Sequence, residues 1–188
     1  MTSLWNATAG EAPLARPGRP SVGSVPLDTA TTWDTIIVGG GYTGLWTARA
    51  LLEADPAHRA IVLEANTCGF GASGRNGGWC SALFPTSTAS LAQRHGTEAA
   101  LAMRHAMRDT VTTVADAVAA DGIECDFARG GTLTVATAPT HVERIKAHAE
   151  DDDVWLDASA ATERFATATS FGASYTPHCA ALHPLKLV

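Results

Sequence analysis

Hydrophobic residues in the N-terminal third follow two different periods, and the change of period outlines a strand, a helix and a second strand. The β-branched run Thr35–Val38 is short and continuous, as in a strand buried on both faces of a parallel sheet. In residues 43–54, leucines and alanines recur at helical spacing until Asp55-Pro56 ends the pattern. Ala60–Leu63 predicts a second buried strand. The order strand, helix, strand predicts a βαβ unit.

The middle of the chain carries a longer helical pattern. Residues 91–120 show an apolar stripe at helical spacing and predict one long helix, which Asp121-Gly122 ends. We interpret the methionines of this stripe as core residues, because Met fills irregular gaps between other side chains. The stripe consists of Met103, Met107, Val111, Val114 and Val118.

After Ile123 the pattern changes to short segments typical of strands, and a different layer of the fold is expected to begin there. Residues 124–128 and 132–137 predict strands joined by the turn Arg129-Gly130-Gly131. Pro139 suits the first turn of a short helix that extends to residue 149, and the acidic run 151–153 predicts a solvated loop. Residues 154–156 and 170–175 are further strand predictions.

A glycine-rich turn, GGGYTG from Gly39 to Gly44, joins the first predicted strand to the first predicted helix and satisfies G-x-G-x-x-G. Gly39 permits the tight turn, Gly41 lets a pyrophosphate approach the backbone, and Gly44 lets helix and strand pack closely. Thr43 lies where the helix begins and is a further candidate for phosphate contact. Amides at a helix start lack intrahelical partners, so an anion is stabilised there without a lysine.

Glu64 adds to this motif, because it stands at the end of the second strand, twenty residues after Gly44. An acid at this place accepts hydrogen bonds from a ribose, and the context predicts a dinucleotide site. The alternative is a plain glycine turn with an incidental Glu64. The fingerprint does not distinguish FAD from NAD, because both present an ADP moiety to the same half-domain. A nicotinamide-dependent dehydrogenase is therefore another alternative.

A second glycine-rich stretch, CGFGASGRNGG at residues 68–78, predicts a structured loop. Together with the first turn it carries a family resemblance. Residues 34–85 closely resemble the start of FAD-dependent oxidoreductases of the D-amino-acid oxidase group, in the branch of glycine, sarcosine and gamma-glutamylputrescine oxidases. The resemblance extends more loosely through GGTLTVAT to the final YTPHCAALHPLKLV. It implies FAD as the cofactor, and GASGRNGG is its most specific part.

The resemblance also implies roles for residues of this loop, which in the family lies along the FAD pyrophosphate towards the flavin ring. Carried over, Ser73 and Arg75 would contact the phosphates. Asn76, Gly77 and Gly78 would approach the isoalloxazine. Small residues allow close backbone approach, and Arg offers fixed donors to phosphate oxygens. The alternative role for Arg75 is a solvated loop charge.

The implied reaction is oxidation of the C–N bond of a small-molecule amine or amino acid. A hydride leaves the C–H beside nitrogen for the flavin, water hydrolyses the resulting imine, and dioxygen or another electron acceptor reoxidises the flavin. Substrate-binding side chains of such enzymes come mostly from later sequence, so we assign no catalytic residue. Some relatives hold flavin covalently, but we expect Cys80 to be an unlinked thiol.

Composition restricts the partners. The formal net charge is −6 and Lys and Arg are not clustered, so we expect no nucleic acid. No apolar run reaches the roughly 18 residues of a membrane span, and no signal-peptide pattern opens the chain, so we expect a cytoplasmic protein. The cysteines lack a Cys-x-x-Cys pair, which favours reduced thiols. We assign no metal to His178, Cys179 and His183.

We therefore expect an α/β fold in which a Rossmann-like FAD-binding βαβ half-domain is followed by the start of a mixed α+β substrate layer. A second βαβ half has no sequence left to build it, so we expect a fold that is incomplete at the C-terminus. The alternative function is a catalytically silent truncated fragment that at most binds a nucleotide or partner.

The sequence predicts four parts. They are an irregular arm (1–32) with Pro13, Pro17, Pro20 and Pro26, the N-terminal part of the FAD-binding domain (33–122), part of the substrate domain (123–180) and a truncated return to the FAD domain (181–188).

Overall fold

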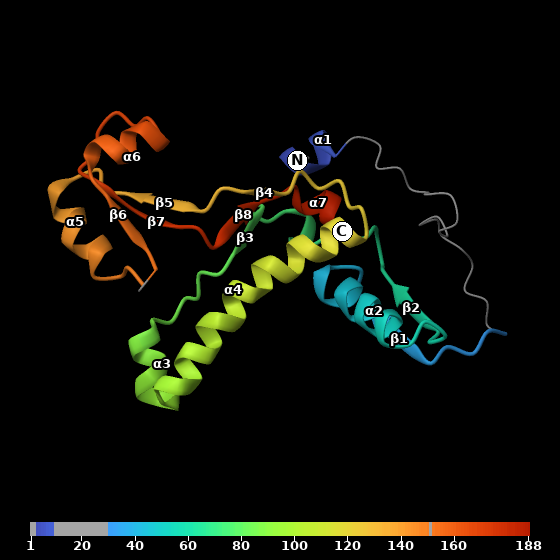
Figure 1. Cartoon of the computed structure of the whole chain (residues 1–188). Helices are drawn as coiled ribbons and strands as arrows, with labels where there is room; N and C mark the ends of the chain where they lie inside the picture. Colours follow the sequence, from blue (N-terminus) through green and yellow to red (C-terminus); the bar gives the residue numbers. More distant parts are fainter. Residues whose placement is uncertain (1–2, 10–29, 151) are drawn as a thin grey trace. The chain divides into compact units, whose positions relative to one another are not determined.

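The computed structural model describes residues 3–9, 30–150 and 152–188 (Figure 1). The four prolines of the predicted arm lie outside the described residues. The chain packs as two compact units. The predicted boundary after residue 122 differs from this packing, because residues 79–122 pack with the strands that follow them. The first unit contains Met1–Gly78, Ile123–Cys125 and His183–Val188, and the second contains Trp79–Gly122 and Asp126–Leu182.

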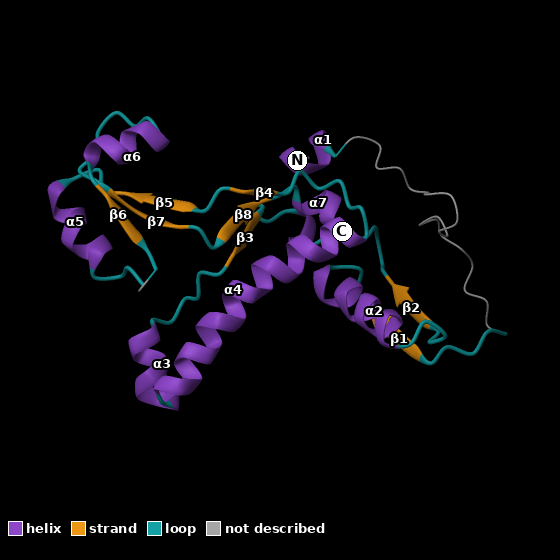
Figure 2. Cartoon of the chain, in the orientation of Figure 1, coloured by secondary structure: helices purple, strands orange, loops and turns teal. Residues whose placement is uncertain are grey.

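The first unit is built on the βαβ segment that the hydrophobic pattern predicts (Figure 2). Strand β1 spans Thr35–Val38, helix α2 spans Tyr42–Ala54 and strand β2 spans Ala60–Leu63. The strands are parallel, with Thr35 opposite Ala60 and Val38 opposite Leu63. Both predicted strands are confirmed, and the predicted helix begins one residue earlier than expected.

Helix α2 covers one face of the β1–β2 sheet. Ile37 lies on that face, since its Cγ2 is 3.2 Å from the position of a Cβ added to Gly44. The alternate positions Ile36 and Val38 are 59% and 85% exposed. Within the described residues, the second face of this buried-type strand, which Ile36 and Val38 share, is therefore largely exposed.

Three short helices complete the first unit. They are α1 (Leu4–Thr8), the 3-10 helix η1 (Ala72–Gly74) and α7 (Pro184–Leu187). The arm that was expected to be irregular thus contains a helix. Ser3 explains its start, because the Ser3 Oγ accepts a hydrogen bond from the Asn6 amide at 3.2 Å as an N-cap.

The second unit contains two antiparallel sheets of three strands each. In one sheet β8 lies between β3 and β4, and in the other β7 lies between β5 and β6. Strand β6 is confirmed as predicted, β7 begins three residues later than predicted, and α5 ends at Lys146 instead of residue 149. The strands of these two sheets and the two helices that lie between them in the sequence after β5 are β3 (Trp79–Ser81), β4 (Ala128–Arg129), β5 (Thr132–Val135), α5 (Pro139–Lys146), β6 (Val154–Leu156), α6 (Ala158–Arg164), β7 (Ala173–Thr176) and β8 (Cys179–Ala181).

The predicted hairpin around Arg129-Gly130-Gly131 does not form. Strand β4 pairs with β8 and β5 pairs with β7, so the turn carries the chain from one sheet to the other. The Gly131 amide donates to the Cys179 carbonyl oxygen at 3.0 Å. The strand predicted over residues 124–128 is also wrong for residues 124–127, which are not in a strand. The strand that forms, β4, consists of Ala128 and Arg129, which pair with β8.

The helix predicted over residues 91–120 is divided into α3 (Thr88–His95) and α4 (Thr97–Ala120). Gly96 separates them with φ 86 and ψ 156. This backbone conformation is essentially restricted to glycine, so the change of chain direction depends on Gly96. The prediction of a single helix missed this break, because one glycine hardly disturbs an apolar stripe.

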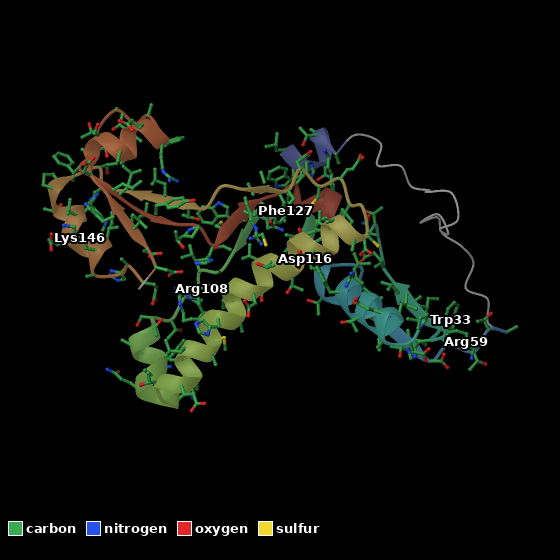
Figure 3. All side chains as sticks on the ribbon, viewed as in Figure 1. Trp33, Arg59, Arg108, Asp116, Phe127 and Lys146 are labelled. Atoms are coloured by element: carbon green, nitrogen blue, oxygen red, sulfur yellow. The ribbon has the colours of Figure 1, made fainter. Side chains whose placement is uncertain are left out.

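The core of the second unit forms where α4 packs against β3. Val111, Ala82 and Ala180 are buried there, and Met107 and Phe127 pack against them. Phe127 is labelled in Figure 3. The predicted core role is therefore confirmed for Met107. It is wrong for Met103, which is 41% exposed, because the contact of α4 with this core lies further along the helix.

The acidic run predicted as a solvated loop contains an ion pair. Asp152 binds Arg108 of α4, labelled in Figure 3, and also His178. Burial raises the pKa of Asp152, but the hydrogen bond to His178 and the charge of Arg108 outweigh burial, so the pKa is lowered. The solvated-loop prediction is therefore wrong for Asp152. Asp151 lies outside the described residues.

Candidate dinucleotide-binding site

The turn between β1 and α2 requires glycine at its first and last motif positions. Gly39 has φ 107, a region that favours glycine, and its amide donates to the Leu63 carbonyl oxygen at 2.8 Å. A Cβ on Gly44 would lie 2.1 Å from the Gly39 carbonyl oxygen. No side chain fits at that distance, so the close approach of α2 to β1 depends on Gly44.

The start of α2 presents backbone N–H donors next to Gly41, which has no side chain. Gly41 is the N-cap residue, and Thr43 and Gly44 lie in the first turn, where helix geometry leaves amides without intrahelical acceptors. A Cβ on Gly41 would meet the Ser73 side chain, whose Oγ would lie 2.9 Å away. The Ser73 Oγ accepts a hydrogen bond from the Tyr42 amide at 3.0 Å. An anion here would meet amides, a positive helix end and a hydroxyl group.

Glu64 is held against the same turn by both of its carboxylate oxygens. Its Oε2 accepts from the Gly40 amide at 2.8 Å, and its Oε1 accepts from the Asn66 amide at 2.9 Å. The hydrogen bonds from Gly40 and Asn66 lower the pKa of Glu64. Each oxygen keeps further acceptor capacity, so the ionised carboxylate can still accept hydroxyl donors.

The Asn76 side chain fixes the second glycine-rich loop. Its Nδ2 donates to the Ser73 carbonyl oxygen at 2.8 Å, and its Oδ1 accepts from the Gly78 amide, also at 2.8 Å. Gly78 is buried with φ 72, whereas a Cβ added to Gly77 would face open space. The loop is therefore internally fixed at Asn76, with an uncovered backbone at Gly77.

Arg75 belongs to the same loop and is exposed. Its guanidinium carbon lies 4.6 Å from the centre of the Phe70 ring, a cation–π contact. The phosphate role of Arg75 stays a prediction, as do the FAD roles of Ser73, Asn76, Gly77 and Gly78.

Two further residues shape this site without a signal in the sequence motif. Tyr42 stands at a variable motif position, yet its hydroxyl donates to the Pro184 carbonyl oxygen at 2.9 Å. A Cβ on Gly40 would lie 2.6 Å from the Cys68 Sγ, so the Cys68 side chain packs directly against the turn at Gly40. Burial raises the pKa of the Cys68 thiol, and the charge of Glu64 adds to this effect.

The three residues considered for a metal site have other contacts. His178 binds Asp152, Cys179 is buried in β8, and His183 accepts the Lys186 amide as the N-cap of α7. Within the described part of the chain, no group of three or more His, Cys, Asp or Glu side chains is arranged to hold a metal ion.

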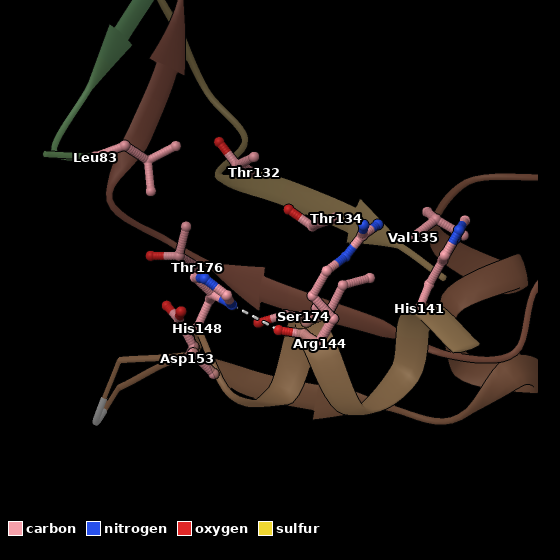
Figure 4. A pocket seen from close by; sticks show the side chains of 12 residues that line it. Leu83, Thr132, Thr134, Val135, His141, Arg144, His148, Asp153, Ser174 and Thr176 are labelled. Carbon is pink, nitrogen blue, oxygen red and sulfur yellow. Dashed lines mark hydrogen bonds between the residues drawn. The ribbon is translucent and has the colours of Figure 1, made fainter. Parts of the chain in front are cut away.

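A cavity of about 430 Å³ lies in the second unit, beside α5 and the strands β5 and β7 (Figure 4). Thr134 and Ser174 are opposite each other in the β5–β7 register and bring hydroxyl groups to it. Arg144 and His141 reach toward one end of the cavity, and Asp153 lies at the other end (Figure 4). Apolar side chains, among them Leu83, Val135 and Ile145, line the rest of the cavity.

The first unit thus defines a class of protein. A parallel strand–turn–helix–strand segment with glycines at the turn, backbone amides at the helix start and a carboxylate after β2 forms one half of a dinucleotide-binding fold. Residues 34–188 match the family described as DAO, FAD dependent oxidoreductase. The chain belongs to this family of FAD-dependent oxidoreductases.

Two curated relatives are similar in sequence. The gamma-glutamylputrescine oxidoreductase of Escherichia coli (strain K12) is 31% identical over 171 residues, which are 86% of this chain and 40% of that protein. The probable oxidoreductase OrdL of Haemophilus influenzae is 30% identical over 105 residues, which are 56% of this chain and 24% of that protein. This chain therefore spans less than half the length of the curated relatives it matches.

Two solved structures are similar in fold, which confirms the predicted α/β class. Glycine oxidase from Bacillus cereus ATCC 14579 has a TM-score of 0.61 at 19% identity, covering 83% of this chain and 41% of that one. Glycine oxidase from Geobacillus kaustophilus has a TM-score of 0.58 at 27% identity, covering 82% of this chain and 42% of that one.

Among the described helices, none combines the length and apolar character needed to cross a membrane.

Proposed function

We propose that the first unit binds the ADP half of FAD at the start of α2. The pyrophosphate lies over Gly41 and against the amides of Thr43 and Gly44, and the Glu64 carboxylate accepts the adenosine ribose hydroxyls. The accessible backbone at Gly41 supports this proposal, because among the described residues a Cβ there would meet the Ser73 side chain alone. The donors available are neutral amides and a hydroxyl group, which suit a diphosphate at a helix N-terminus.

The second glycine-rich loop continues the site in this proposal. Ser73 accepts the Tyr42 amide and keeps its own hydroxyl proton, which it can donate to a phosphate oxygen. Arg75 is exposed and can turn from Phe70 to a phosphate. Asn76, Gly77 and Gly78 extend towards the flavin ring, and the uncovered backbone at Gly77 allows close approach.

We further propose that the chain is the cofactor-binding part of an oxidoreductase that oxidises the C–N bond of an amine or amino acid. The observation that carries this proposal is the match of residues 34–188 to the FAD-dependent family. Its relatives are named gamma-glutamylputrescine oxidoreductase and glycine oxidase. FAD supplies the hydride acceptor for this oxidation, and dioxygen or another acceptor regenerates it.

In this function the chain's own residues bind and orient the cofactor. The turn and loop fix the diphosphate at one end, and the Asn76 hydrogen bonds hold the loop backbone in one conformation. The Glu64 carboxylate serves as the acceptor, and the hydrogen bonds from Gly40 and Asn66, which lower its pKa, favour its ionised form.

The test uses the flavin-loaded oxidoreductase of which this chain is the proposed cofactor-binding part, mixed anaerobically with a panel of primary amines, secondary amines and amino acids. At least one should bleach the flavin absorbance, and admission of an acceptor should restore it. Bleaching by NADPH with no amine or amino acid active would contradict the proposed substrate class. A protein that retains flavin but responds to none of these reductants would also contradict it.

A further inference from the structure

Helix α1 is a part of the first unit that the family match does not include, since that match begins at residue 34. It consists of residues Leu4–Thr8. Although it is only five residues long, it contacts α7 and the glycine-rich loop that is proposed to face FAD. These contacts connect segments that are far apart in the sequence.

Trp5 makes the contact with the loop. Its indole Nε1 donates to the Asn76 carbonyl oxygen at 2.7 Å, while the Asn76 side chain bridges Ser73 and Gly78. The Asn76 side chain and main chain are therefore fixed by separate hydrogen bonds. Trp5 fixes the carbonyl group that directly precedes Gly77, where the backbone is uncovered.

His183, the N-cap residue of α7, is the residue on which Trp5 packs. It is 5% exposed, and its ring meets the Trp5 ring edge-to-face at 4.9 Å between centroids. Its Nδ1 accepts the Lys186 amide at 3.2 Å at the start of α7. The neutral ring therefore carries its proton on Nε2, which lies 3.1 Å from the Thr8 Oγ1.

Thr8 completes the connection. Its Oγ1 accepts from the His183 Nε2 and donates its own proton to the Leu4 carbonyl oxygen at 2.8 Å. The donors and acceptors thus run in one direction from α7 to α1. The side chains of Trp5 and Thr8 point to the same partner, while Leu4 is 67% exposed.

We propose that α1 is a positioning strap for the glycine-rich loop, in which Trp5 and Thr8 are positioning residues for FAD. Anchored on His183, the strap holds the Asn76 carbonyl group and so keeps Gly77 and Gly78 in the conformation that FAD meets. A loop that is already ordered loses less conformational freedom when the cofactor binds. This inference rests on the proposed FAD site.

The test replaces Trp5 by Phe, which removes the indole N–H and keeps an aromatic ring. Amide hydrogen exchange of Gly77 and Gly78 is measured without FAD, and the FAD dissociation constant is measured by titration. In Trp5→Phe we expect faster exchange at both amides and an FAD dissociation constant raised about five- to tenfold, the loss typical of one hydrogen bond. Leu4→Ala is the matched control, with both readouts unchanged.

Unchanged exchange and unchanged affinity in Trp5→Phe would overturn the strap. If the native chain does not bind FAD at all, the proposed function fails, and the exchange measurement still decides whether α1 orders the loop. If Trp5→Phe does not fold, Thr8→Val gives the answer instead. It removes the hydroxyl group that His183 meets, so faster exchange at Gly77 and Gly78 supports the strap and native exchange overturns it.

Discussion

At the scale of single residues, two glycines of the same turn are needed for different reasons. Gly44 is required by packing, because a Cβ would lie 2.1 Å from a backbone oxygen that cannot move away. Gly41 is less constrained, because in the part of the chain that the structure describes the close neighbour of a Cβ there would be the terminal atom of the Ser73 side chain. In our account, Gly41 is needed for the pyrophosphate.

Alanine substitutions separate these two roles. We expect Gly44→Ala to lower the free energy of unfolding by about 3 kcal/mol, since overpacking against fixed backbone is costly. We expect Gly41→Ala to change it by less than about 1 kcal/mol while weakening FAD binding more than tenfold. Chemical denaturation and FAD titration measure both effects. Native FAD affinity in a folded Gly41→Ala protein would rule out the placement of the pyrophosphate.

Glu64 predicts a dependence on pH. Its pKa is lowered from the ordinary value of 4.5, so its hydrogen bonds to Gly40 and Asn66 stabilise the folded state above pH 4.5. That contribution is lost as the pH falls through the lowered pKa. We expect Glu64→Gln to show a smaller drop in melting temperature than the native chain on going from neutral to acid pH. Equal drops in the two proteins would show that Glu64 is not held in this way.

At the scale of elements, Gly96 decides how the chain passes from α3 to α4. Its φ of 86 and ψ of 156 lie in a region that costs other residues about 1 to 3 kcal/mol. We expect Gly96→Ala to destabilise the second unit by this amount. Gly130→Ala is the control, since a Cβ there meets nothing within 4 Å and the change should stay within about 0.5 kcal/mol. Equal stabilities of the two variants, measured by urea denaturation, would contradict the role of Gly96.

The elements that the sequence predicts best are those with local signals. β1, α2 and β2 agree with prediction to within one residue, because apolar periodicity and turn glycines act within each segment. β3 and β8 were missed, since each has only three residues and each is stabilised by a strand about a hundred residues away. Pairing between distant strands leaves no periodic pattern in either one.

The same limit applies to the candidate site. The glycines and Glu64 follow from a motif whose spacing reflects a single βαβ unit. Trp5 and Tyr42 could not be found in this way, because their hydrogen bonds reach Asn76 and Pro184 across long stretches of sequence. Tryptophan and tyrosine are common in hydrophobic cores, so the residue types at these two positions did not indicate a role in the site.

At the scale of the whole molecule, cofactor binding should be coupled to folding. Within residues 3–9, 30–150 and 152–188, the β1–β2 sheet has two strands, and Ile36 and Val38 are exposed on its open face. Small sheets with an uncovered apolar face have little stability of their own. A ligand that binds only the folded state adds stability by mass action, about 2.7 kcal/mol at a concentration one hundred times its dissociation constant.

The most direct test of FAD binding is the hydrogen-exchange footprint of FAD on this chain, with NAD⁺ as the comparison ligand. Amide exchange is followed while FAD is titrated to saturation and the melting temperature is recorded. We predict one FAD per chain, a rising melting temperature and slower exchange at Gly41–Gly44 and at Ser73–Gly78, with a weaker effect from NAD⁺. Absence of saturable FAD binding, or protection confined to other segments, would contradict the account.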